Sequence, residues 1–365
     1  MEFKIGRNAL EKTLSSVVKI IPPKSTYTVL QNVMLEAKDK QVSVEATDLD
    51  IFIRRVVTAD VKDTGKVLIP GKKILEITRE SNADEIVFKL KELNLQISTG
   101  NAHFSIPSLD SQEFPEVPKF PEKKWFDLKL GEALESVNST VFMVAKDISR
   151  RPMNGVLIQI KDGELRFVTT DGARLALNRT ETKEGSTGEM IVAPKLFDIV
   201  DYDNADAPLE VYAEERMMGL KFQDTTIIAR LIEGPYPNYE GVIPKNFVGN
   251  CTISKDVLDG ALKRVSLVSS PHIKNVKFDF GGGGVVLSAS SPDIGEAKEE
   301  IPGAYEGDKL GVWFNASYII EILRHIGTSD VVMQLTSQST AALMGPKDDD
   351  KNLYLLMPLR IEGWE

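Results

Sequence analysis

The sequence predicts an α+β fold built from three tandem similar domains, each with two helices packed on antiparallel sheet. One observation is an internal repeat, because Ala46-Thr47-Asp48 recurs 123 residues later as Thr169-Thr170-Asp171. A second is the spacing of Phe114-Pro115, Tyr236-Pro237 and Met357-Pro358, which divide the 365-residue chain into thirds. Solenoid repeats span only a few tens of residues, so units of this length indicate whole domains.

Each third shows the same order of expected elements: an amphipathic helix, a β-hairpin, a second helix and further alternating strands. The first helices are expected at residues 7–19, 131–146 and 254–269, and the second helices at 71–80, 193–201 and 315–325. The hairpin strands are expected at 33–37 with 42–46, 156–160 with 165–168, and 276–280 with 285–288. Because connectors rich in Pro and charged residues separate the repeats, we expect domains at 1–121, 122–246 and 247–365.

The composition is that of an ordinary globular protein, with 42% hydrophobic and 27% charged residues. No apolar run reaches the length of a signal peptide or a transmembrane helix, so we expect a cytoplasmic protein without a membrane partner. The single cysteine, Cys251, excludes an internal disulfide and is expected to be a small buried residue. The net charge of −10 argues against a protein that coats nucleic acid, but it allows a local basic strip.

The sequence offers no catalytic or metal-binding constellation. The histidines lie in different repeats or elements, without metal-ligand spacing: His103, His272 and His325. The run Gly281 to Gly284 lacks the lysine of a phosphate-binding loop and is expected to be a hairpin turn. Asp48 and Asp171 recur in register, which favours a structural role in turns. We therefore expect a non-catalytic protein without a cofactor, with a hydrolase that uses the two aspartates as the enzymatic alternative.

Several motifs, in this order and spacing, carry a family resemblance. They are Ala46-Thr47-Asp48-Leu49-Asp50, Asn154-Gly155-Val156, Thr170-Asp171-Gly172-Ala173-Arg174-Leu175-Ala176, Phe314-Asn315-Ala316-Ser317-Tyr318 and Tyr354-Leu355-Leu356-Met357-Pro358-Leu359-Arg360. Over essentially its whole length the chain resembles the bacterial DNA sliding clamps, the beta subunits of the replicative DNA polymerase III holoenzyme. The resemblance implies the DNA-clamp fold and a head-to-tail homodimer that forms a closed ring, with helices lining the pore.

The function implied by the resemblance is that of a DNA polymerase processivity factor. Such a ring encircles duplex DNA without reading its sequence, slides along it and tethers partner proteins. The implied partners are the replicative DNA polymerase, the clamp loader and other proteins that carry a clamp-binding motif. The implied location is the nucleoid in the bacterial cytoplasm. A repeat-built interaction scaffold that does not encircle DNA is the alternative.

Basic residues recur at nearly equivalent corners of the repeats, after each first helix. They are Lys24, Arg150, Arg151 and Lys274. In a ring, cations at these corners would meet backbone phosphates without reading bases, which suits sliding. Weaker candidates for DNA contact are Arg7, Lys72, Lys73 and Arg79. The six expected helices carry twelve Lys and Arg against ten Asp and Glu, so a solvated helix face is the alternative for these charges.

The resemblance also implies a hydrophobic pocket between the second and third domains, for a peptide motif with Gln first and Leu and Phe following. Its implied lining is Met153, Thr170, Gly172, Arg174, Leu175, Pro237, Val242, Asn315, Tyr318, Leu355, Leu356, Met357, Pro358 and Leu359. Apolar, flexible side chains can adapt to several peptides, whereas ordinary core packing is the alternative for any single one.

Three features depart from the family pattern near this pocket. Gly241 stands where family members often carry Arg, and Ala173 replaces a bulkier residue. The chain also continues as Glu362-Gly363-Trp364-Glu365 beyond the usual end. We expect Trp364 to pack near the mouth of the pocket and to weaken peptide entry.

The dimer contact implied by the resemblance joins domain one of one copy to domain three of the other. Phe104 and Ile106 are expected on one side, with Leu267 and Val268 on the other. Pairing of edge strands at this contact would remove two free sheet edges. Core packing inside one domain is the alternative for these four residues.

Overall fold

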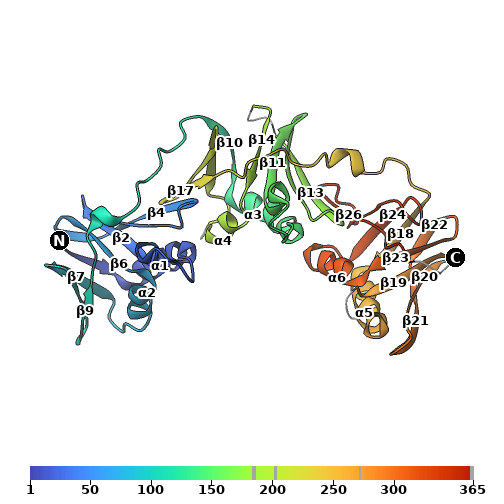
Figure 1. Ribbon diagram of the computed structural model, residues 1–365, viewed down its shortest axis with the longest axis horizontal. Coiled ribbons are helices and arrows are strands. Elements are labelled where there is room, and N and C mark those ends of the chain that lie inside the picture. The colour runs from blue at the N-terminus through green and yellow to red at the C-terminus, as the bar shows by residue number, and fades with distance from the viewer. Residues whose placement is uncertain (183–185, 201–203, 271–272, 362–365) are drawn as a thin grey trace. The chain divides into compact units, whose positions relative to one another are not determined.

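The computed structural model describes residues 1–182, 186–200, 204–270 and 273–361, so His272 and Trp364 lie outside the described residues. The chain divides into two compact units, whose helices and strands are labelled in Figure 1. Unit 1 comprises residues 1–134, 184–186 and 192–231, and unit 2 comprises residues 135–183, 187–191 and 232–365. Helix α3 (Leu130–Asn138) contributes residues to both units. The middle third of the chain is therefore shared between the two units.

Unit 1 is built on two antiparallel sheets, with strand orders β5-β1-β7-β8-β9 and β10-β15-β16-β17-β4-β3-β2-β6. The strands are β1 (Glu2–Gly6), β2 (Asn32–Lys38), β3 (Gln41–Thr47), β4 (Ile51–Thr58), β5 (Asp60–Asp63), β6 (Gly65–Pro70), β7 (Glu85–Lys91), β8 (Asn94–Thr99), β9 (Ala102–Pro107), β10 (Lys124–Lys129), β15 (Pro208–Glu214), β16 (Met217–Phe222) and β17 (Thr225–Arg230). The helices are α1 (Arg7–Val17), α2 (Gly71–Arg79) and α4 (Lys195–Ile199). Helix α1 packs on β3 and β4 and buries Leu10, Leu14 and Val17.

Unit 2 also has two sheets, with strand orders β14-β11-β12-β13-β26-β25-β24-β18-β22 and β21-β20-β19-β23. The strands are β11 (Val156–Lys161), β12 (Glu164–Thr170), β13 (Arg174–Glu181), β14 (Gly188–Val192), β18 (Gly249–Ser254), β19 (Asn275–Gly281), β20 (Gly284–Ser291), β21 (Gly295–Pro302), β22 (Ala304–Gly307), β23 (Leu310–Asn315), β24 (Asp330–Leu335), β25 (Ala342–Pro346) and β26 (Asn352–Leu356). Helices α5 (Lys255–Val265) and α6 (Ala316–His325) pack on each other. Their apolar faces share one core with Phe278, Phe280 and Phe314.

The helices expected from the sequence are present, but several are shorter than expected. Helix α3 ends at Asn138, although its apolar pattern continues to residue 146. The hydroxyl groups of Ser139 and Thr140 both donate to the carbonyl oxygen of Ser136, and such local bonds compete with helix continuation. The turn predicted at Gly281 to Gly284 is confirmed, and Cys251 is buried as predicted. Among the described helices, none has the length and apolar character needed to cross a bilayer.

The repeated aspartates form equivalent turns, which confirms their predicted structural role. Asp48 Oδ1 accepts hydrogen bonds from the backbone nitrogens of Asp50 and Ile51. Asp171 Oδ1 accepts in the same way from Ala173 and Arg174. Each carboxylate therefore satisfies two backbone donors in the turn that starts the next strand, β4 in one case and β13 in the other.

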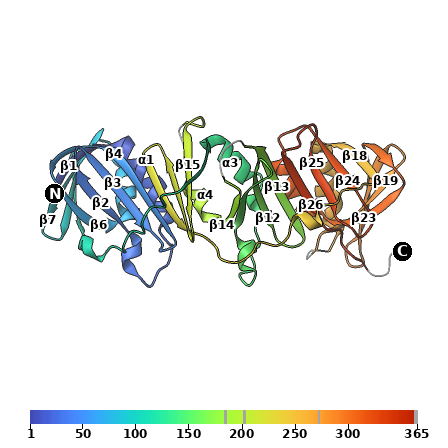
Figure 2. The ribbon, with the colours of Figure 1, turned by 90° about the horizontal axis from the view of Figure 1, so that it is seen from above.

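Strand pairing joins successive repeats inside each unit. In unit 1, β4 pairs with β17, and Arg55 lies opposite Thr225. In unit 2, β13 pairs with β26, and Asn178 lies opposite Asn352. Figure 2 shows β13, β26, β25 and β24 side by side. The eight-stranded sheet of unit 1 and the nine-stranded sheet of unit 2 therefore run from one repeat into the next, whereas the two smaller sheets each lie within one repeat. The domain boundaries near residues 121 and 246 stay a prediction.

The carboxyl group of Glu45 makes stability in unit 1 depend on pH. Its side chain in β3 is 12% exposed, and burial raises its pKa more than nearby Arg54 lowers it. A raised pKa means that the folded state holds the proton more tightly, so this contribution to stability is lost as pH rises through the folded pKa. We expect Glu45→Gln to raise the free energy of unfolding at about pH 7.5 and to change it little at about pH 4.

Urea unfolding at the two pH values measures this effect. The matched control is Glu36→Gln, because Glu36 lies on the neighbouring strand and forms a more exposed ion pair with Lys66. The control should show no comparable gain at the higher pH. An equal change for Glu45→Gln at both pH values would contradict the assignment.

Candidate partner-peptide surface and DNA-contact residues

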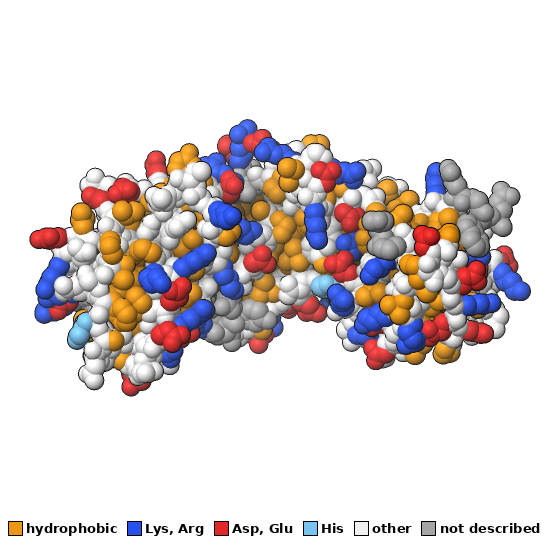
Figure 3. All heavy atoms as spheres, turned by 60° about the horizontal axis from the view of Figure 1, so that its bottom comes forward, with side chains coloured by type: hydrophobic (Ala, Val, Ile, Leu, Met, Phe, Trp, Pro, Cys, Tyr) orange, Lys and Arg blue, Asp and Glu red, His pale blue; other side chains and the backbone are white. Residues whose placement is uncertain are grey.

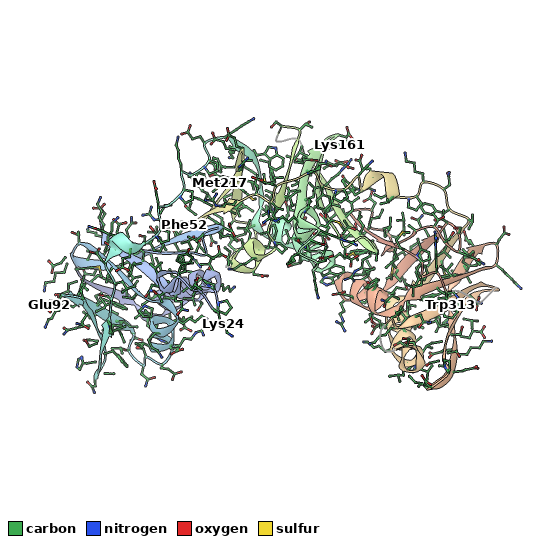
Figure 4. All side chains as sticks on the ribbon, viewed as in Figure 1. Lys24, Phe52, Glu92, Lys161, Met217 and Trp313 are labelled. Atoms are coloured by element: carbon green, nitrogen blue, oxygen red, sulfur yellow. The ribbon has the colours of Figure 1, made fainter. Side chains whose placement is uncertain are left out.

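The segment that follows β26 is fixed by two backbone hydrogen bonds in unit 2. The backbone nitrogen of Met357 donates to the carbonyl oxygen of Ala173 at 2.9 Å, and the backbone nitrogen of Leu359 donates to the carbonyl oxygen of Trp313 at 2.8 Å. The position of Trp313 is marked in Figure 4. Met357 is 41% exposed, so the fixed backbone presents an unbranched apolar side chain to solvent.

Arg174 links the start of β13 to helix α6. Its Nε lies 2.9 Å from Asp171 Oδ2, and its Nη1 lies 2.6 Å from Glu321 Oε2. The guanidinium carbon also lies 4.4 Å from the centroid of the Tyr318 ring, within the range of a cation–π contact. Burial favours the neutral form of Arg174, but the hydrogen bonds with Glu321 and Asp171 outweigh it and raise the pKa. The cation is therefore committed to internal partners.

Gly172 allows a second arginine to approach the same turn. Its φ of +91° lies in the region that favours glycine. A Cβ at this position would lie 2.8 Å from Arg150 Nη1 and 3.6 Å from the terminal methyl group of Met153. Arg150 Nη1 donates to the carbonyl oxygen of Asp171 at 3.2 Å. Arg150, which the sequence predicts to contact DNA, therefore lies beside the predicted pocket residues Gly172 and Met153. Its contact with DNA stays a prediction.

A linker of residues 232–247 packs on the sheet of unit 2. Its Tyr239 is buried in one apolar cluster with Leu175 and Leu355, and Ile243 packs against the same cluster. Val242 follows directly and is 52% exposed. The linker therefore brings an exposed apolar side chain to the unit that also carries Met357.

Three family models match successive stretches of the chain. The N-terminal domain of the DNA polymerase III beta subunit matches residues 1–118, the central domain matches 128–238 and the C-terminal domain matches 240–360. The chain belongs to the DNA polymerase III beta subunit family. The resemblance predicted from the sequence is thereby confirmed, and with it the role of a DNA polymerase processivity factor. A scaffold that does not encircle DNA is not favoured.

Known members of this family match the chain over nearly its full length. The beta sliding clamp of Pseudomonas aeruginosa is 27% identical over 367 residues, which cover 99% of this chain and 100% of that one. The crystal structure of a DnaN sliding clamp from the same organism, bound to griselimycin, has a TM-score of 0.95 at 27% identity, covering 99% and 100%. The DNA polymerase III beta subunit of Thermotoga maritima has a TM-score of 0.93 at 26% identity, covering 99% of each chain.

The residues implied for the peptide pocket all lie in unit 2 and differ in exposure. Those that are buried are Thr170, Arg174, Leu175, Leu355 and Leu356. Those that are half-buried are Met153, Asn315, Tyr318, Pro358 and Leu359. Those that are exposed are Gly172, Pro237, Val242 and Met357. Asn315 uses its side chain to cap α6, accepting from the nitrogen of Ser317. Their role in peptide binding stays a prediction.

The residues predicted to contact DNA have different local roles. Arg7 donates to the carbonyl oxygens of Thr78 and Arg79 and so closes the C-terminal end of α2. Lys73 pairs with Glu76 on the same helix. The exposed members are Lys24, Lys72, Lys73, Arg79, Arg150, Arg151 and Lys274. Lys24 lies beside the helices of its unit (Figure 4), and on the face shown in Figure 3 basic and acidic side chains are intermingled.

The four residues predicted for the dimer contact are partly or fully accessible. Leu267 is 76% exposed and Phe104 is 38% exposed, while Ile106 and Val268 are half-buried. Phe104 and Ile106 lie on β9, the last strand of its sheet. Ile77, Ser81, Thr99 and Phe104 also line a cleft of about 450 Å³. Exposure of this size does not fit the alternative of core packing for Phe104 and Leu267.

Gly172→Ala tests the local geometry of the turn. We expect the free energy of unfolding to fall by about 1–2 kcal/mol, because an alanine at a positive φ is strained and its Cβ must displace the Arg150 guanidinium. Urea unfolding measures the change. The matched control is Gly327→Ala, where a Cβ meets nothing within 4 Å and φ is not positive. Equal losses in the two variants would argue against a special role for Gly172.

Proposed function

We propose that two copies of this chain close head to tail into a ring that encircles duplex DNA and slides along it. The ring would tether the replicative DNA polymerase, the clamp loader and other proteins with a clamp-binding motif, and would catalyse no reaction itself. We place it on the nucleoid in the bacterial cytoplasm. The observation that carries the proposal is the succession of the three beta-subunit domains over residues 1–118, 128–238 and 240–360.

Two strand pairs join successive repeats, β4 with β17 and β13 with β26, and we call them the first and second joints. The register of these joints supports head-to-tail closure of the ring. At the first joint, the fifth residue of β4, Arg55, lies opposite the first residue of β17, Thr225. At the second joint, the fifth residue of β13, Asn178, lies opposite the first residue of β26, Asn352. The same strand register therefore occurs at both joints within one chain.

The third joint would form between two copies. In the third repeat, β21 corresponds to β4 and β13, and in the first repeat β9 corresponds to β17 and β26. Both β21 and β9 stand at the edges of their sheets, with backbone groups open to another strand. Applying the same register places Glu299 opposite Ala102 and Lys298 opposite His103. The cleft beside Phe104 would then receive an apolar side chain such as Leu267 of the second copy.

Contact with DNA in this proposal is electrostatic and independent of sequence. The principal candidates stay Lys24, Arg150, Arg151 and Lys274, with Arg7, Lys72, Lys73 and Arg79 as weaker ones. Exposed cations that meet phosphates can exchange partners as the ring slides, whereas fixed contacts with bases would arrest it.

A cross-linking experiment tests the proposed register. We expect a variant with His103→Cys and Lys298→Cys to form covalent dimers under mild oxidation, because directly opposed cross-strand residues have Cβ atoms about 5 Å apart. Non-reducing gel electrophoresis measures the product. The control carries His103→Cys with Glu299→Cys, whose side chains would point to opposite faces of the sheet. Stronger cross-linking in the control would exclude this register.

Peptide binding tests the proposed partner surface. We expect a labelled Gln-x-Leu-x-Phe peptide to bind saturably. We expect Met357→Ala to weaken binding about tenfold, because the peptide would lose its apolar contact with the exposed Met357 side chain. Fluorescence polarisation measures the affinity. Leu93→Ala is the matched control, since Leu93 is 63% exposed and lies in the other unit. Peptide binding that Met357→Ala leaves unchanged would place the site elsewhere.

A further inference from the structure

A charged contact ties the linker to the hairpin formed by β11 and β12. Both carboxylate oxygens of Glu240 accept from Lys161 Nζ, at 2.8 and 2.6 Å. Arg166 Nη1 donates to the same carboxylate at 2.6 Å. Lys161 is the last residue of β11, marked in Figure 4, and Arg166 lies within β12. One linker carboxylate thus bridges two neighbouring strands, and we call this group of three side chains the clasp.

The preceding linker residue strengthens the attachment. Tyr239 is 6% exposed, and its hydroxyl group donates to Gln159 Oε1 at 2.7 Å while accepting from Arg166 Nη1 at 3.3 Å. Its ring packs in the apolar cluster that contains Leu175. Two successive linker residues are therefore fixed to the hairpin, one by burial and one by charge.

The clasp sets the position of the residues that follow it. The nitrogen of Val242 donates to the carbonyl oxygen of Tyr239 at 3.3 Å, and that of Ile243 donates to the carbonyl oxygen of Glu240 at 3.4 Å. These bonds close a tight turn over Glu240–Val242. Gly241 lies at the centre of this turn. A glycine backbone has more conformational freedom than that of other residues, so more entropy is lost when this turn becomes ordered. Tyr239 and Glu240 are fixed before Gly241, and Ile243 packs against the same apolar cluster as Tyr239 after it. These attachments therefore restrict where Val242 can lie.

We propose that Glu240 is a positioning residue, which through the clasp holds Val242 in place for the partner peptide. This inference rests on the proposed function, because it concerns the same peptide surface. Glu240 itself need not touch the peptide, since both of its oxygens are engaged by Lys161 and Arg166. Its contribution is preorganisation: a linker that is already ordered loses less conformational entropy when the peptide binds.

Electrostatics favour a closed clasp near neutral pH. The hydrogen bond from Lys161 is the main cause that lowers the pKa of Glu240, so the carboxylate stays charged. The side chain of Arg166 is only 13% exposed, whereas those of Lys161 and Glu240 are 39% and 42% exposed. A single exposed ion pair contributes little, but a partly buried arginine that shares its acceptor with a lysine forms a network.

Two measurements on Glu240→Gln test the inference. We expect the affinity for the labelled Gln-x-Leu-x-Phe peptide to weaken about fivefold, because part of the binding free energy must then order the linker. We also expect hydrogen exchange of the backbone amides of Val242 and Ile243 to accelerate, while exchange across β11 and β12 stays unchanged. The exchange measurement separates a displaced linker from a general loss of stability.

Glu164→Gln is the matched control. Glu164 accepts from Arg166 Nε at 2.8 Å, but it belongs to β12 and not to the linker. We expect it to change peptide affinity by less than about twofold. Equal affinities of the unmodified protein and Glu240→Gln, with binding still sensitive to Met357→Ala, would overturn the inference and leave the proposed function standing. Absence of peptide binding by the unmodified protein would overturn both, and faster exchange throughout β11 and β12 would also overturn a role limited to the linker.

Discussion

Backbone pairing between successive repeats is the constraint on which the rest of the structure depends. A strand at a sheet edge leaves a row of backbone amide and carbonyl groups unpaired. Such an edge can pair with another chain unless another strand pairs with it or another element covers it. Pairing of β4 with β17 and of β13 with β26 removes four such edges within the chain, two at each joint. The turns of Asp48 and Asp171 lie at the start of β4 and β13, so the same type of turn positions one strand of each joint. The candidate peptide surface is assembled around the second joint.

The two joints have the same backbone pairing but differ in the side chains that pair with their aspartates. At the first, Asp48 pairs with Lys195 at the start of α4. At the second, Asp171 pairs with Arg174, which extends to Glu321 and to the ring of Tyr318 in α6. The second arrangement leaves room at Gly172 for Arg150. The repeated turns therefore give both joints the same chain path, while different side chains at equivalent positions surround only the second joint with the candidate peptide surface.

The hairpins and the aspartate turns could be predicted from the sequence, because each depends on residues close together in the chain. The repeats could be predicted because the same short motif recurs at a spacing of 123 residues. The end of α3 could not be predicted from apolar spacing, since side-chain bonds to Ser136 decide it. The place of Arg150 depends on the positive φ of Gly172, which a motif does not display. The clasp joins residues 74 and 79 positions apart, and no local pattern assigns a partner to Glu240.

The pairing of charged side chains around the candidate peptide surface has a consequence for how partners would be held there. Arg174 is neutralised by Asp171 and Glu321, and both cations of the clasp are occupied by Glu240. At the proposed peptide surface, affinity would then rest mainly on apolar side chains such as Met357, and burial of apolar surface is little affected by moderate salt. Contact with DNA through exposed cations weakens steeply as salt rises. The proposed ring would therefore keep its partners bound at a salt concentration that loosens its contact with DNA, which suits sliding.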